Sequence, residues 1–260
     1  METPAQDQLS QVLRLLRLLY KDTLSGLSGV LHCVSSVRVA DEPARRHVIN
    51  INEHAPRSAT DSFVLNLARA SADAIVTTAE VLRAEPQLSH ELQGPLAQGL
   101  ARYRRAVLGK LEPPCVAILT RSAQLPPEHR VFRDQNLNLV LTAPEHAPLL
   151  AAKLARAQVL GVPALDIHSA VSLLEQRGAR TILIEAGPST AGRLYDPPSR
   201  VQHLLLSQFD GALDARALGG ALPPEAALFS GLACVSEHSV QEPSGPWRFQ
   251  HWQRSDRQHE

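Results

Sequence analysis

ILIEAGPSTAGRLYD, residues 182–196, joins a buried strand, a turn of small residues and the start of a helix. We expect the strand over 181–186 and a helix over 189–195, with Pro188 at an early helical position. A helix start presents unpaired N–H groups at its positive end, and Gly187 has no side chain to keep a phosphate away. On the residues alone, a Gly-Pro turn of purely structural use remains an equal alternative.

Strand and helix patterns alternate on both sides of this stretch. Apolar runs of the continuous kind found in sheets covered on both faces occupy 73–78, 115–120 and 137–142. The other expected strands are 29–40, 47–52, 203–209 and 247–254. The expected helices are a leucine-rich one around 12–19, then 58–70 with Ser58 and Thr60 as candidate caps, 94–108, 146–160, and 165–179 closed by Gly178.

This alternation predicts an α/β fold, a single domain with a mostly parallel mixed central sheet flanked by helices, plus an N-terminal helix. We expect residues 1–27 to be a helical extension and 28–260 to be the domain itself. The extension has apolar residues on one side and Arg14, Arg17 and Lys21 on the other. We interpret it as a helix packed on the body or on a second subunit, with membrane binding as the alternative.

Composition excludes several classes of function. The 26 basic and 26 acidic residues leave no net charge, so the chain has no basic field for nucleic acid, and we expect no nucleic-acid partner. No apolar run has the roughly 20 residues of a membrane span, and we expect no membrane partner. The three cysteines are far apart, the eleven histidines are dispersed without ligand spacing, and the N-terminus lacks a signal-peptide pattern. We therefore expect a cytoplasmic protein without a metal site.

The stretch at 182–196 resembles the cofactor turn of the pyrimidine reductases of riboflavin biosynthesis, the RibD C-terminal family. That family shows a strand, then Glu-(Gly/Ala)-Gly-Pro-Thr, then a helix; here the residues are EAGPS at 185–189. A second block, SATDSFVLNLARASADAIVTTAEVLRAEPQL at 58–88, resembles the family's Ser-led helix, Arg-Ala dipeptide and Asp-Ala-Ile strand. The resemblance covers roughly 28–212 and implies a fold like that of dihydrofolate reductase.

The resemblance also implies roles for individual residues. In the family, the turn and helix start hold the diphosphate of NADPH, and a small hydroxyl residue after another strand lies near the cofactor. Glu185 and Arg69 fall on positions that bind the substrate, and a guanidinium suits a phosphate group. Their alternatives are a carboxylate that satisfies backbone donors and an exposed helix residue. The positions that correspond to the cofactor site are Gly187, Pro188, Ser189, Thr190, Ala191, Gly192 and Thr120.

Several family positions differ in this chain. The Asp-Gly that follows the family's first strand is absent at 35–38, which reads Ser-Ser-Val-Arg. Glu80 stands where the family has a cofactor-contacting Thr, Ala84 replaces an Asp, and Glu91 replaces a phosphate-binding Arg. A carboxylate facing a dinucleotide phosphate is repelled. Either the ligand has changed or catalysis has been lost.

Two hypotheses follow from the resemblance and its departures. The first is an NADPH-dependent oxidoreductase that transfers hydride to the sugar C1′ of 5-amino-6-(5-phosphoribosylamino)uracil or a related phosphorylated pyrimidine ribosylamine, acting as a homodimer. The second is a catalytically silent homologue that serves as a dimeric binding or scaffold subunit. No catalytic side chain is assigned, because such catalysis consists mainly of positioning a cofactor and a substrate. The sequence leaves the true substrate and the choice between NADPH and NADH open.

Overall fold

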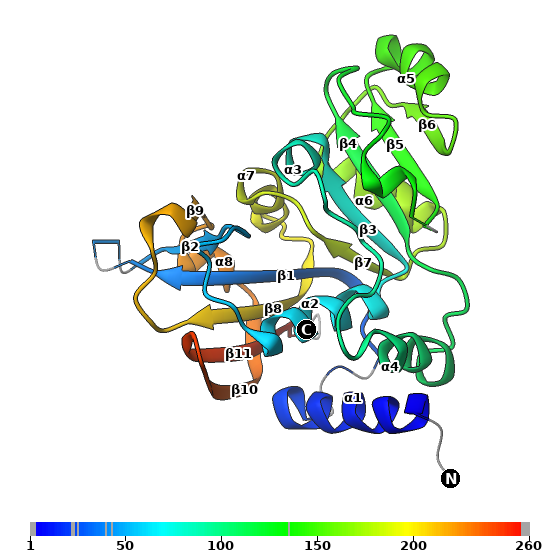
Figure 1. Cartoon of the computed structure of the whole chain (residues 1–260). Helices are drawn as coiled ribbons and strands as arrows, with labels where there is room; N and C mark the ends of the chain where they lie inside the picture. Colours follow the sequence, from blue (N-terminus) through cyan, green and yellow to red (C-terminus); the bar gives the residue numbers. More distant parts are fainter. Residues whose placement is uncertain are drawn as a thin grey trace, which may run out of the picture.

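The structure, a computed structural model, describes residues 4–21, 24, 26–39, 41–42, 44–134 and 136–255. One sheet runs through the whole molecule, with helices on both of its faces (Figure 1). The strands are β1 Gly29–Arg38, β2 Arg46–Ile49, β3 Ala74–Thr78, β4 Cys115–Thr120, β5 Asn138–Thr142, β6 Ala157–Gly161, β7 Thr181–Ile184, β8 Val201–Phe209, β9 Leu218–Ala221, β10 Leu232–Glu242 and β11 Gly245–Arg254. The α-helices are α1 Pro4–Tyr20, α2 Ala59–Ser71, α3 Ala79–Ala84, α4 Ala97–Arg102, α5 Ala147–Lys153, α6 Ile167–Gln176, α7 Pro188–Ala191 and α8 Glu225–Leu228. The shorter turns of helix are η1 Tyr103–Val107, η2 Arg130–Phe132, η3 Pro144–His146, η4 Gly192–Tyr195 and η5 Ala215–Ala217.

The sheet is mixed. Its main path is β10-β11-β8-β1-β7-β3-β4-β5-β6, with β2 and β9 as a branch beside β1. The six pairings from β8 through β6 are parallel, whereas the four that involve β2, β9, β10 and β11 are antiparallel. The expected α/β fold with a mostly parallel mixed sheet and an N-terminal helix is confirmed.

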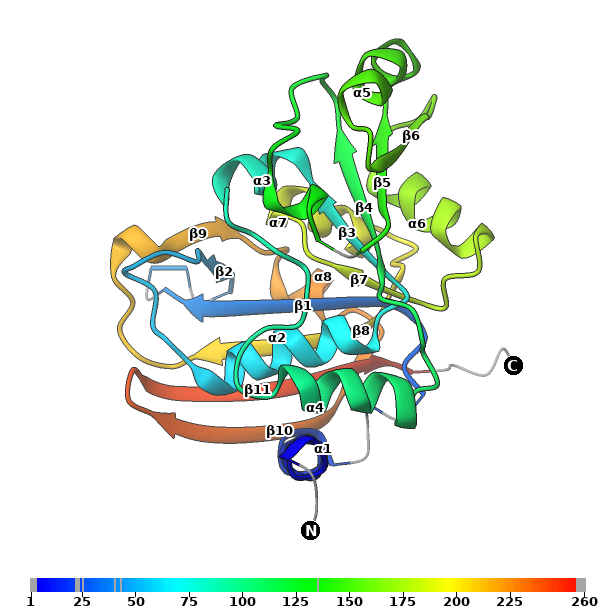
Figure 2. The same cartoon turned by 45° about the vertical axis from the view of Figure 1, so that its right-hand side comes forward.

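Three apolar clusters hold the layers together. One packs α1, α2 and α4 on one face of β1, β8 and β11, and Figure 2 shows α1 end-on beneath this layer. The second packs α6, η4 and α8 on the opposite face, and the third fills the space around β4 and β5 below α5. The residues at the strand centres are almost fully buried, which accounts for the continuous apolar runs of the sequence.

Local chemistry explains the helix ends that the sequence indicates. Ser58 is the N-cap of α2, where its hydroxyl accepts a hydrogen bond of 2.9 Å from the amide of Asp61. Gly178, which follows the C-cap Arg177 of α6, has a φ of +91°, a conformation that glycine adopts without steric cost.

The expected helix over 146–160 is wrong in its second half. The helix ends at Lys153, and the chain then forms β6 at the edge of the sheet. Among the described strands, β6 pairs with β5 alone, and it is half-exposed, so its sequence lacks the apolar run of an interior strand. Nor does the helix expected over 189–195 form as one unit, since α7 has four residues and continues as η4. Among the described helices, none has the length and apolar character needed to cross a bilayer.

Candidate functional site

A cavity of about 610 Å³ opens at the carboxyl ends of β3 and β4. Ligands of parallel α/β sheets bind at this edge, because the loops that follow the strands meet there. Three elements enclose it: α3 after β3, the N-terminus of α6, and α7 after β7. Its lining residues are Thr78, Ala79, Glu80, Arg83, Leu119, Thr120, Arg121, Ser122, Leu165, Asp166, Ile167, His168, Ser189, Thr190, Arg193 and Asp196.

Hydroxyl groups at the strand ends shape this cavity. Thr78 caps α3, and its Oγ1 accepts a hydrogen bond from the amide of Val81. Thr120 ends β4, and its hydroxyl donates to the carbonyl oxygen of Ser122 over 2.7 Å. These bonds hold the two threonines in place at the cavity wall.

The turn after β7 forms the opposite wall. Gly187 has a φ of −57°, and no heavy atom lies within 4 Å of the position a Cβ would take, so the space beside it is open. Ser189 and Thr190 line the cavity. The amides of Thr190 and Ala191 both donate to the carbonyl oxygen of Gly187, and a proline at 188 has no N–H. This turn therefore offers fewer free amides than its sequence predicts, and side chains must supply most of the contacts to an anion.

The remaining predicted cofactor residues lie behind that wall. Ala191 is buried, and a Cβ on Gly192 would lie 3.5 Å from the ring of Pro223. Both residues pack α7 and η4 onto the body of the protein. Of the seven positions that correspond to the family's cofactor site, Thr120, Ser189 and Thr190 line the cavity directly.

Three guanidinium groups and three carboxylates also face the cavity. Arg193 lies 3.7 Å from Asp196, and the carboxylate of Asp166 accepts a hydrogen bond from the amide of Ser169. Arg83 donates to a backbone oxygen over 3.4 Å. Arg121 and Glu80 have no hydrogen bond or ion pair with the described residues, so their charges remain available to a ligand.

Arg69 and Glu185 form a buried ion pair with each other. The Nε and Nη2 atoms of Arg69 donate to the two carboxylate oxygens of Glu185 over 2.8 and 2.7 Å, and Nη1 donates to the carbonyl oxygen of Ser89. Burial alone would raise the pKa of Glu185, but the charge and hydrogen bonds of Arg69 outweigh it and the net pKa is lowered. Neither residue lines the cavity. Arg69 is not an exposed helix residue, and the carboxylate of Glu185 binds Arg69 rather than backbone donors, so both alternatives considered from the sequence are wrong.

His90 lies beside this pair. Its Nε2 is 3.7 Å from the carboxylate of Glu185, and neither ring nitrogen has a hydrogen-bond partner among the described residues. Burial lowers the pKa of His90 to about 4, an effect that the charge of Glu185 reduces. The imidazole is therefore neutral at pH 7.

The family positions that differ in this chain lie in different surroundings. Glu80 faces the cavity, whereas Ala84 ends α3 and is exposed. The amide of Glu91 donates to the hydroxyl of Ser89, within the segment that covers Arg69. In the second half of β1, Ser35 donates to Asp61 over 2.7 Å, and burial raises the pKa of that carboxyl.

Two of the six charged lining residues, Arg121 and Asp166, lie directly after a strand or directly before a helix, and this position is a signal that the sequence itself carries. Arg121 and Ser122 come directly after the strand expected at 115–120, and Asp166 is the N-cap of α6. Within the described part of the chain, no group of three or more His, Cys, Asp or Glu residues could hold a metal ion.

Comparison with known proteins shows the family to which this chain belongs. Residues 40–197 match the sequence model of the RibD C-terminal domain. The chain belongs to the RibD C-terminal domain family. This family consists of NAD(P)H-dependent reductases that typically use NADPH. No curated protein matches the chain.

Solved structures of RibD-type proteins share the fold. A pyrimidine reductase-like protein of Corynebacterium diphtheriae superposes with a TM-score of 0.62 at 20% identity, covering 92% of this chain and 98% of that one. RibD of Acinetobacter baumannii gives 0.60 at 16% identity, with 90% of this chain and 60% of that chain covered. The riboflavin biosynthesis reductase Rib7 of Saccharomyces cerevisiae gives 0.56 at 12% identity, with 95% and 100% covered.

Proposed function

We propose that this family member is an NADPH-dependent reductase whose dinucleotide binds in the cavity at the ends of β3 and β4. The observation that carries the proposal is the composition of the cavity wall, where hydroxyls of five residues and three guanidiniums surround about 610 Å³. Ligand pockets commonly have volumes of about 300–1,000 Å³. Hydroxyl donors and arginines are the groups that bind phosphate, so the chemistry of the wall fits a dinucleotide.

Different residues of the cavity wall would bind different parts of the dinucleotide. Ser189 and Thr190 would hold the diphosphate together with the open backbone at Gly187, and Thr120 would contact the cofactor from the end of β4. Arg121, which is free of protein partners among the described residues, would supply a cation for a phosphate group. When bound, NADPH supplies the hydride, and the protein contributes orientation and the exclusion of water.

The proposed substrate is a phosphorylated pyrimidine ribosylamine or a related compound, reduced at the sugar C1′ of its open imine form. The resemblance assigns Arg69 and Glu185 to this substrate. Because the two side chains bind each other, substrate contact would require one of them to exchange its partner. We propose that the protein is cytoplasmic, on the basis of its composition, and that it is a homodimer, because members of the family are commonly dimers.

A second candidate function is a catalytically silent binding or scaffold subunit. The carboxylate of Glu80 on the cavity wall and the closed Arg69–Glu185 pair favour it. The open space beside Gly187 and the guanidiniums of the cavity favour the reductase. Binding of the cofactor distinguishes the two.

The test is thermal unfolding with NADPH, with NADH and with neither. A ligand at a hundredfold excess over its Kd stabilises the folded state by about 2.7 kcal/mol. We expect this stabilisation for the unaltered chain and its loss in Gly187→Asp, because the new carboxylate would stand at the N-cap of α7, the helix that carries Ser189 and Thr190, and would repel a phosphate bound there. Gly187→Ala is the matched control, since a methyl group there meets nothing within 4 Å.

Two outcomes would contradict the proposal. The absence of stabilisation by either dinucleotide would favour the scaffold subunit over the reductase. Equal stabilisation of Gly187→Asp and Gly187→Ala would show that the dinucleotide binds somewhere else.

A further inference from the structure

The short strand β9 lies against the turn that carries the cavity wall. Its sequence is Leu-Gly-Gly-Ala, and it belongs to the part of the chain beyond the family match. A Cβ on Gly220 would lie 2.8 Å from Cγ of Pro188, closer than such atoms approach in proteins. Only a residue without a side chain therefore allows β9 to lie this close to α7.

The topology explains why β9 reaches this place. The first half of β1 pairs with β7, and its last residues, from Ser36 to Arg38, pair with β2. The chain leaves the sheet after β7, and β2 with β9 continues the sheet just beyond that point. In Figure 2, β9 lies beside β2 on the side toward α7.

On the side away from α7, β9 packs closely against β2 and the residue that follows it, so it cannot move away from α7. A Cβ on Gly219 would lie 2.6 Å from the side-chain oxygen of Asn50 and 2.7 Å from the carbonyl oxygen of Val48, so the strand is in close contact with β2 as well. The backbone amide of Asn50 also donates to the carbonyl oxygen of Ala217, and the backbone amide of Leu222 donates to the carbonyl oxygen of Arg46. β9 thus fills the space between β2 and Pro188.

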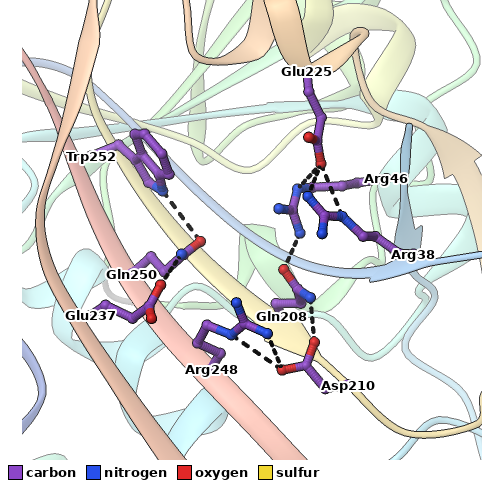
Figure 3. Close-up of polar contacts among 9 residues, drawn as sticks. All are labelled: Arg38, Arg46, Gln208, Asp210, Glu225, Glu237, Arg248, Gln250 and Trp252. Atoms are coloured by element: carbon purple, nitrogen blue, oxygen red, sulfur yellow. Dashed lines mark hydrogen bonds and ion pairs between the residues drawn. The ribbon is translucent and has the colours of Figure 1, made fainter. Parts of the chain in front are cut away.

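Ion pairs fix the segment that follows β9. Glu225, at the start of α8, lies 2.6 Å from Arg38 of β1 and 3.1 Å from Arg46 of β2 (Figure 3). Arg46 is buried and also donates to Gln208, which in turn donates to Asp210. These contacts tie both ends of the β9 segment to the sheet, so a group added on β9 would displace Pro188 rather than β9.

We propose that Gly220 is a positioning residue that sets the place of the turn at Pro188, and with it the place of Ser189 and Thr190 on the cavity wall. The inference rests on the proposed function, because the wall is taken to hold the dinucleotide. Pro188 is followed directly by the two hydroxyl residues that line the cavity, so a shift of its ring moves them relative to Thr120 across the cavity. A displacement of a binding group by a fraction of an ångström to 1 Å is enough to weaken the contacts it makes.

The test is a double-mutant cycle read as the Kd for NADPH and as the thermal midpoint. We expect Gly220→Ala to raise the Kd about tenfold. The new methyl group would meet Cγ of Pro188. Apart from Cδ, no other atom of residue 188 lies within 4 Å of that methyl position. Pro188→Ala removes Cγ and with it the clash. Adding Gly220→Ala to Pro188→Ala should therefore change the Kd less than twofold.

Each result has a defined meaning. If the Kd of the double variant returns to that of Pro188→Ala, the positioning role is supported. A general loss of stability in β9 would not produce this recovery. An equal rise in Kd in both backgrounds, or no rise with Gly220→Ala alone, overturns the inference while leaving the proposed function intact. If the unaltered chain does not bind NADPH, the proposed function fails and the inference fails with it.

The cycle also covers a variant that does not fold. If Gly220→Ala is insoluble, a folded double variant that binds NADPH supports the contact with Pro188. A double variant that is also insoluble overturns it, because the clash would then lie with other atoms.

Discussion

The guanidinium of Arg69 occupies both carboxylate oxygens of Glu185, a residue that the proposed function assigns to the substrate. The side chains of both residues are about one-tenth exposed or less, at 10% for Glu185 and 6% for Arg69. Removing one partner of a buried ion pair costs about 3–5 kcal/mol, because the other charge remains buried without compensation. Neither side chain can therefore be lost alone without destabilising the fold, whatever its role toward a substrate.

We expect Glu185→Gln to lower the free energy of unfolding by about 3 kcal/mol. In the double variant Arg69→Met with Glu185→Leu, neither charge of the pair remains, and we expect most of that loss to be recovered. Urea unfolding at pH 7.5 measures both. If Glu185→Gln unfolds at the urea concentration of the unaltered protein, the carboxylate is not held by Arg69 in solution and is free for other partners.

Contacts between helices decide the position of the N-terminal helix. The buried face of α1 includes Val12, Leu16 and Tyr20, and the helix lies on α4 and on the β10–β11 hairpin. At the crossing with α4, a Cβ on Gly99 would lie 2.7 Å from the backbone oxygen of Gln8. Backbone atoms cannot turn aside as a flexible side chain can, so α1 has to move if this space is filled.

We expect Gly99→Ala to destabilise the protein by about 1–2 kcal/mol. Overpacking of this kind costs about 1–3 kcal/mol, and the better helix propensity of alanine offsets about 1 kcal/mol of it. Thermal or urea unfolding measures the difference. If Gly99→Ala raises the stability, then α1 does not pack on α4 at this distance.

The elements that could be predicted from the sequence are those whose pattern reflects their own burial. β3, β4, β5 and β7 are covered on both faces, so an apolar run identifies each of them. β9 contains two glycines and β10 is mostly exposed, and both depend on pairing with distant strands. Their local sequence has no such run, and β9 and β10 were not among the expected strands.

Local sequence likewise indicates only part of the candidate site. Ser189 and Thr190 could be located because they belong to a recognisable turn, and Thr120 because it ends an apolar run. The partnership of Arg69 with Glu185 joins residues 116 positions apart, which no local pattern indicates. His90 and Gly220 act through close approach of distant segments, so only the folded chain reveals them.

Buried histidines set the response of the whole molecule to acid. Burial lowers the pKa of His32 and of His90 to about 4, and burial together with the charge of His203 lowers that of His251 to about 3. In the unfolded chain a histidine titrates near pH 6.5. Between pH 6.5 and 4 the unfolded chain therefore takes up protons that the folded protein does not, and stability falls as the pH falls.

Carboxyls whose pKa burial raises act in the opposite sense. Burial raises the pKa of Asp61 and Asp134, so the folded protein takes up those protons before the unfolded chain does and gains stability as the pH falls. That gain begins near the raised pKa of each carboxyl and grows toward the ordinary carboxyl range near pH 4. The loss from the histidines begins at pH 6.5, so we expect it to dominate near pH 5.

We expect the free energy of unfolding to be lower at pH 5 than at pH 7.5, with about 2 kcal/mol of the difference due to His90 alone. His90→Leu removes the titrating group and breaks no hydrogen bond to the described residues, so it should reduce the difference by that amount. Leu88→Ala, two residues away, is the matched control, because it loses apolar packing equally at both pH values. Urea unfolding of the three proteins at both pH values measures the effect. If His90→Leu keeps the full pH dependence, His90 is protonated in the folded state at pH 5, and Glu185 rather than burial governs its charge.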